Sequence, residues 1–147
     1  MIPLPHYQHR SIAILGLGKS GLAAASALRA SGAHVVLWDD KSENTQGETL
    51  THYSEWDWKT LSLVVMSPGI PLTFPAPHPL VALAKEHNVR VTCDISLLME
   101  ACPEATYIGI TGTNGKSTTT ALIAHTLSSL GTVVRYGGNI GVPVLGM

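Results

Sequence analysis

The chain has 147 residues, 45% hydrophobic and 13% charged, with a formal net charge of −1. This composition favours a folded domain with a buried core and argues against disorder. The scattered lysines and arginines form no basic field, so we expect neither nucleic acid nor a membrane surface as partner. Two cysteines without CxxC spacing, and no signal-peptide or membrane-length apolar run, predict a reduced, cytoplasmic protein.

The first half of the chain begins with a βαβ pattern. Residues 11–15 and 34–38 are short apolar runs typical of buried parallel strands. Between them, the turn Gly16-Leu-Gly-Lys-Ser-Gly21 precedes an alanine-rich helical pattern over residues 22–31. The turn matches the G-x-G-x-x-G fingerprint of dinucleotide-binding folds, so an α/β fold with a Rossmann-like parallel sheet is expected.

The same turn predicts an anion site. A diphosphate can bind at the helix N-terminus, where Lys19 and Ser20 offer N–H groups. Asp39 ends the next strand near the offset of roughly 20 residues expected for a ribose-binding carboxylate. The motif alone indicates NAD or FAD, but a UDP-sugar fits it equally well. The alternative without a ligand is a turn that serves only tight packing of strand on helix.

The middle of the chain continues the α/β pattern. Residues 42–60 are polar and aperiodic, and we expect a loop or short helix there. A strand is expected over 61–66, running into the turn Ser67-Pro-Gly-Ile-Pro71. After a proline-dense loop, the pattern predicts a helix over 80–87, a strand over 89–93 and a helix over 95–101 capped by Asp94. The break at Cys102–Ala105 predicts a domain boundary, with domains 1–104 and 105–147.

A second glycine-rich turn follows an apolar strand expected over 106–111. Its Gly-x-x-Gly-Lys-Ser is part of a phosphate cradle, although Ile110 stands where the full Walker pattern has glycine. Lys116 can reach terminal phosphates, and the hydroxyl of Ser117 or Thr118 can ligate Mg2+. A glycine-rich turn that binds nothing is the alternative.

A helix to about Leu130, a strand over 133–136 and a loop over 137–143 should follow the cradle. One such unit cannot bury both faces of a parallel sheet, so we expect an incomplete second domain and a longer parent protein.

Two phosphate sites in one chain favour ATP-driven group transfer, because a simple dehydrogenase needs no triphosphate. Gly112-Thr-Asn-Gly-Lys-Ser-Thr118 resembles the ATP-binding signature of the Mur ligases and folylpolyglutamate synthetases. With the first turn, Ser67-Pro-Gly-Ile70 and Gly138-Asn-Ile-Gly-Val-Pro143, the whole chain resembles the N-terminal part of Mur ligases that join D-glutamate to UDP-N-acetylmuramoyl-L-alanine in peptidoglycan precursor synthesis.

The resemblance implies a UDP-substrate domain followed by the start of a P-loop ATP-binding domain. It implies UDP-substrate contacts from Gly18, Lys19, Ser20, Asp39, Asp40, Lys41, Ser67, Gly69 and Asn139. It implies ATP contacts from Gly112, Thr113, Asn114, Gly115, Lys116, Ser117 and Thr118. Lys116 and Ser117 would be catalytic, with Ser117 on Mg2+.

In the implied reaction, ATP converts the substrate carboxylate to an acyl phosphate, which the amine of D-glutamate attacks. The family's remaining catalytic groups lie further along, so we expect these 147 residues alone to be inactive. No obligate protein partner is implied. Three other functions stay open: an NAD-dependent oxidoreductase, a nucleotide-sensing module without catalysis, and a Mur ligase that adds another amino acid.

Overall fold

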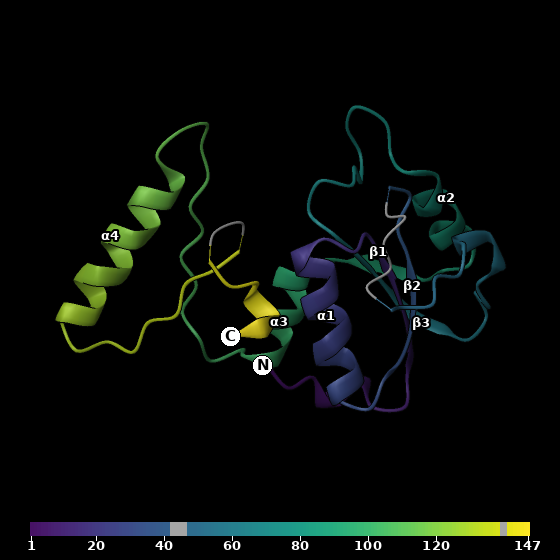
Figure 1. The fold of residues 1–147 in the computed structure, drawn as a ribbon, viewed down its shortest axis with the longest axis horizontal. Helices are drawn as coiled ribbons and strands as arrows, with labels where there is room; N and C mark the ends of the chain where they lie inside the picture. The colour runs from purple at the N-terminus through teal and green to yellow at the C-terminus, as the bar shows by residue number, and fades with distance from the viewer. Residues whose placement is uncertain (42–46, 139–140) are drawn as a thin grey trace.

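A computed structural model describes residues 1–41, 47–138 and 141–147. Its sheet has four parallel strands in the order β2-β1-β3-β4, with β1 paired to both β2 and β3 (Figure 1). The strands are β1 (Ser11–Leu15), β2 (His34–Trp38), β3 (Leu61–Met66) and β4 (Arg90–Thr92). The α/β class and the first three strands are therefore confirmed as predicted, and the fourth is shorter than the expected 89–93.

Helices cover both faces of this sheet. They are α1 (Lys19–Ala30), α2 (Pro79–Glu86) and α3 (Asp94–Ala101), with short 3-10 helices η1 (Pro5–Tyr7), η2 (Tyr53–Glu55) and η3 (Val144–Gly146). Ile12 and Ile14 of β1 face the cluster formed with α1, α3 and η3, whereas Ala13 and Leu15 face α2. Because β1 is buried on both sides, its sequence is apolar at every position after Ser11.

Three helix starts differ from prediction, and that of α2 differs by one residue, since it begins at Pro79 and was predicted at residue 80. α1 begins at Lys19, ahead of the predicted residue 22, because the extended backbone of Gly18 serves as its N-cap. Asp94 is the first residue of α3 and Cys93 is the N-cap, so the predicted capping role of Asp94 was wrong by one position. A loop or short helix was predicted over residues 42–60, and η2 is a short helix within that stretch. Residues 42–46 lie outside the described residues.

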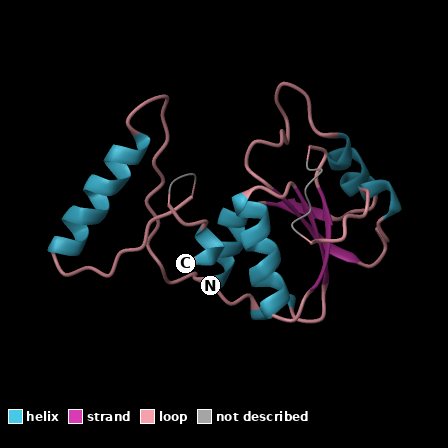
Figure 2. Ribbon diagram, in the orientation of Figure 1, coloured by secondary structure: helices cyan, strands magenta, loops and turns pink. Residues whose placement is uncertain are grey.

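The predicted strands over 106–111 and 133–136 were wrong. Both segments are described, and Figure 2 draws them as loops on either side of α4 (Lys116–Ser129). A strand needs a neighbour to pair its N–H and C=O groups, and neither segment pairs with another strand in the described chain. Val133 is 93% exposed as a result.

α4 lies apart from the helices that cover the sheet (Figure 1). Ala124 is the one buried residue among its fourteen, all of which are described. Its hydrogen bonds are internal to the helix, so it can form without a partner, but tertiary packing adds little to its stability. Within the described residues, none of the helices is both long enough and apolar enough to cross a lipid bilayer.

We predict that amides of α4 exchange with solvent much faster than those of α1. An isolated helix of this length is marginally stable in water, whereas α1 contributes five buried residues to the core. Hydrogen–deuterium exchange followed by mass spectrometry measures both helices in one sample. Equal protection of the two helices would show that α4 is packed against a partner.

Candidate functional site

The glycine-rich turn is held against the end of β3 by a close backbone contact. A Cβ on Gly21 would lie 1.9 Å from the carbonyl oxygen of Gly16, so only glycine fits there. The Ser67 hydroxyl donates to that same carbonyl at 2.8 Å. Gly16 itself has a φ of +92°, in the left-handed region that favours glycine. The contact brings the first turn of α1 directly beside the residue that follows β3.

A pocket of about 160 Å³ opens at this junction, lined by Gly18, Lys19, Ser20, Ser67, Pro68 and Gly138. The N-terminus of α1 has no side-chain cap and no acidic residue in its first turn. Its N–H groups and the positive end of the helix dipole therefore favour an anion here, together with the Lys19 ammonium. The volume is below the roughly 300–1,000 Å³ of typical ligand pockets, so it suits a diphosphate group better than a whole nucleotide.

The structure thus brings four predicted residues into one pocket: Gly18, Lys19, Ser20 and Ser67. Gly69 lies in the turn after Ser67, with a φ of +101° and open space where a side chain would be. Pro68 and Gly138 were quoted as parts of motifs but were not predicted as binding residues. Asn139 lies outside the described residues.

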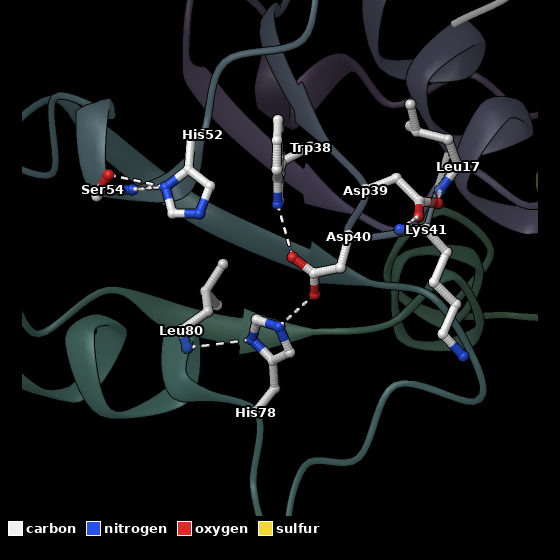
Figure 3. A network of polar contacts seen from close by, with 9 residues as sticks. All are labelled: Leu17, Trp38, Asp39, Asp40, Lys41, His52, Ser54, His78 and Leu80. Atoms are coloured by element: carbon white, nitrogen blue, oxygen red, sulfur yellow. Dashed lines mark hydrogen bonds and ion pairs between the residues drawn. The ribbon is translucent and has the colours of Figure 1, made fainter. Parts of the chain in front are cut away.

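Asp39 connects the end of β2 to the glycine-rich turn. One carboxylate oxygen accepts the N–H of Leu17 at 2.6 Å, and the other accepts the N–H of Lys41 at 2.8 Å (Figure 3). Each oxygen keeps a second lone pair, so the carboxylate can still accept a ligand hydroxyl. Asp39 therefore positions the turn whether or not it also contacts a ligand.

Asp40 makes contacts that the sequence did not predict. Its carboxylate accepts Trp38 Nε1–H at 2.7 Å and pairs with His78 Nε2 at 2.6 Å. His78 Nδ1 accepts the N–H of Leu80 at the start of α2, so Nε2 carries the proton given to Asp40. Partial burial raises the pKa of the Asp40 carboxyl, but these hydrogen bonds outweigh it and lower the pKa overall.

Asp40 thereby ties the end of β2 to the N-terminus of α2. Figure 3 shows its carboxylate between Trp38 and His78, with the side chain of Lys41 pointing away from them. The one sequence signal for the capping role of His78 is its place directly before Pro79, which is the first residue of α2.

The predicted cradle lies at the N-terminus of α4, and all of its residues from Gly112 to Thr118 are exposed. Gly115 is the N-cap, with a φ of +77° and no side-chain cap. The Lys116 ammonium donates to the carbonyl oxygens of Gly112 and Thr113, which closes the loop on itself. The N–H groups of the first turn of α4 remain available to an anion.

A larger hollow of about 320 Å³ lies at the other end of α1, lined by Pro3, Pro5, Gln8, Ala30, Ser31 and Gly32. It has no charged side chain and none of the predicted residues, so we assign it no role. In the described ranges, no three His, Cys, Asp or Glu side chains converge as they would around a metal ion.

Comparison with known proteins shows which family the chain is similar to. Residues 10–93 match the family of MurD-like Mur ligases, over their N-terminal domain. The chain is 47% identical to UDP-N-acetylmuramoylalanine–D-glutamate ligase of Phenylobacterium zucineum, over 100% of the chain and 34% of that protein. It is 46% identical to the enzyme of that name from Rhodospirillum rubrum, over 99% of the chain and 32% of that protein. The chain thus spans about a third of these relatives.

We predict that Gly21→Ala destabilises the chain by about 1–3 kcal/mol, because the new methyl group would overlap the Gly16 carbonyl. Gly18→Ala is the matched control, since a Cβ there would have nothing within 4 Å and the φ of Gly18 is −65°. Urea unfolding followed by circular dichroism measures both variants. Equal midpoints for the two would contradict the packing described for the turn.

The contacts of Asp40 predict a pH-dependent contribution to stability. Its pKa is lower in the folded state, so the contribution is present above the ordinary value of 3.8 and is lost as pH falls through the folded pKa. Asp40→Asn should cost less than about 1 kcal/mol at pH 7, because the side chain is 45% exposed and solvent screens the pair. The difference from wild type should shrink in urea unfolding below pH 3.8. Asp57→Asn, in an exposed loop, is the control. A stability difference between Asp40→Asn and wild type that does not change with pH would refute the role given to the Asp40 contacts.

Proposed function

The chain belongs to the MurD-like Mur ligases, and we propose that it is the N-terminal part of a cytoplasmic enzyme that joins D-glutamate to UDP-N-acetylmuramoyl-L-alanine in peptidoglycan precursor synthesis. One structural observation carries the proposal most directly. The anion pocket at the start of α1 combines residues of the glycine-rich turn with Ser67 and is sized for a diphosphate.

In this proposal the pocket holds the diphosphate of the UDP-linked substrate. Backbone N–H groups at the start of α1 and the Lys19 ammonium offset its negative charge, and Ser20 and Ser67 add hydroxyl groups beside it. The ribose and uracil then extend toward Asp39, Asp40 and Lys41 at the end of β2. Gly69 and Asn139 remain assigned to the same substrate.

Residues 105–147 begin the ATP-binding domain in this proposal, after a boundary at residue 104. The exposed cradle at the N-terminus of α4 fits a triphosphate, because no side chain caps the N–H groups of the first turn. Gly112, Thr113, Asn114, Gly115 and Thr118 would hold the phosphates. Lys116 would exchange its contacts with two carbonyl groups for the terminal phosphates.

The proposed reaction has two steps. The terminal phosphoryl group of ATP passes to the substrate carboxylate, which gives an acyl phosphate and ADP. The amine of D-glutamate then attacks the acyl carbon and displaces phosphate, which forms the amide. Lys116 stabilises negative charge on the transferring group. Mg2+ would share that task with the Ser117 hydroxyl as one of its ligands.

We predict that the chain binds UDP and that Lys19→Ala weakens binding by about tenfold, as expected for loss of one charge-assisted hydrogen bond. Isothermal titration calorimetry with UDP measures this. Lys85→Ala, a lysine in the last turn of α2, is the control and should bind as the wild type does.

Titration with NADH completes the experiment, because the glycine-rich turn also matches a dinucleotide fingerprint. The proposal predicts no saturable response to NADH. Tight NADH binding without any response to UDP would replace the ligase with an oxidoreductase.

A further inference from the structure

The C-terminal segment returns from the exposed region around α4 to the first domain. Val144 and Leu145 of η3 are buried in the same cluster as Leu28 of α1 and Leu97 of α3. The N–H of Ile2 also donates to the Leu145 carbonyl at 3.0 Å. In Figure 1 the yellow C-terminal segment lies beside α3 and near the N-terminus. η3 thus packs against the core of the first domain, whereas the preceding α4 does not.

A backbone hydrogen bond links the rim of the anion pocket to the residues just before η3. The Gly138 N–H donates to the Val142 carbonyl at 3.2 Å, and Val142 lies two residues before η3. A Cβ on Gly137 would lie 2.3 Å from the same carbonyl oxygen and 2.6 Å from Cε of Met147. Gly137 and Gly138 are therefore packed against the segment that carries η3.

Gly138 is also the only lining residue of the anion pocket, among the described residues, that comes from beyond β3 and its turn. Its neighbours across the pocket, Lys19 and Ser67, belong to the first domain. One wall of the pocket therefore depends on where η3 holds Gly138. It does not depend on the packing of α4, whose residues are mostly exposed.

We propose that Val144 and Leu145 are positioning residues for the nucleotide pocket: by anchoring η3 between α1 and α3, they hold Gly138 against the bound diphosphate. The inference rests on the proposed function, because it takes the pocket to be the diphosphate site. When η3 is no longer anchored, Gly138 loses its fixed position, while the sheet and the glycine-rich turn stay intact. Affinity for a uridine diphosphate then falls without global unfolding.

The test is UDP titration of the full 147-residue chain and its variants by calorimetry. Leu145→Ala removes the anchor, and Gly137→Ala displaces the same wall through a clash with the Val142 carbonyl and with Met147, without truncating a core side chain. Each should weaken UDP binding at least fivefold, at a temperature where circular dichroism shows the variant folded. Leu145→Met, which conserves volume, should restore binding to within twofold of wild type.

Two matched controls separate positioning from stability. Leu63→Ala truncates an equally buried leucine of the same cluster, within β3 and outside the lining of the anion pocket. Gly109→Ala adds a methyl group in open space. Both should bind UDP within twofold of wild type, even where Leu63→Ala lowers the melting temperature as much as Leu145→Ala does.

The outcomes distinguish this inference from the function on which it rests. No UDP binding by the wild-type chain would overturn the proposed function, and the inference with it. Wild-type binding together with unchanged affinity in both Leu145→Ala and Gly137→Ala would overturn the inference alone. An equal loss of affinity in Leu63→Ala would also overturn it, because the effect would then reflect general stability.

Discussion

The close approach of the Gly16 carbonyl to Gly21 is the contact on which the first site depends. It lets α1 begin almost at the end of β1, so that the helix N-terminus opens at the carboxyl edge of the sheet. Ser67 fixes the same carbonyl from β3, and Asp39 fixes the turn from β2. The ends of three strands thus meet at one turn, and the anion pocket opens beside that turn.

The two glycine-rich turns differ in how much structure supports them. The first lies at the edge of a four-stranded sheet covered by helices on both faces. Its Gly16 donates to the Trp38 carbonyl and accepts from the Ser67 hydroxyl. The second rests on α4 and on the contacts of Lys116 with its own loop. The first turn therefore has a preformed pocket, whereas the second presents its N–H groups to open solvent.

The sequence predicted those features that depend on local pattern and failed where partners were needed. Apolar runs predicted β1, β2 and β3. The glycine spacing predicted that Gly18, Lys19 and Ser20 line the pocket. Similar apolar runs around α4 did not become strands, because strand formation depends on a neighbour that the pattern does not contain. The pairing of Asp40 with His78 joins residues far apart in the chain, and no local spacing indicates it.

The central claim is that one chain carries two separate anion sites, one for a uridine nucleotide and one for ATP. Amide NMR spectra of the labelled chain, titrated with UDP and separately with ATP and Mg2+, test it most directly. The account predicts that UDP shifts the amide signals of Gly18, Lys19, Ser20 and Ser67, and that ATP shifts those from Gly112 to Thr118. Shifts of the same residues by both ligands, or none near α1 with UDP, would contradict it.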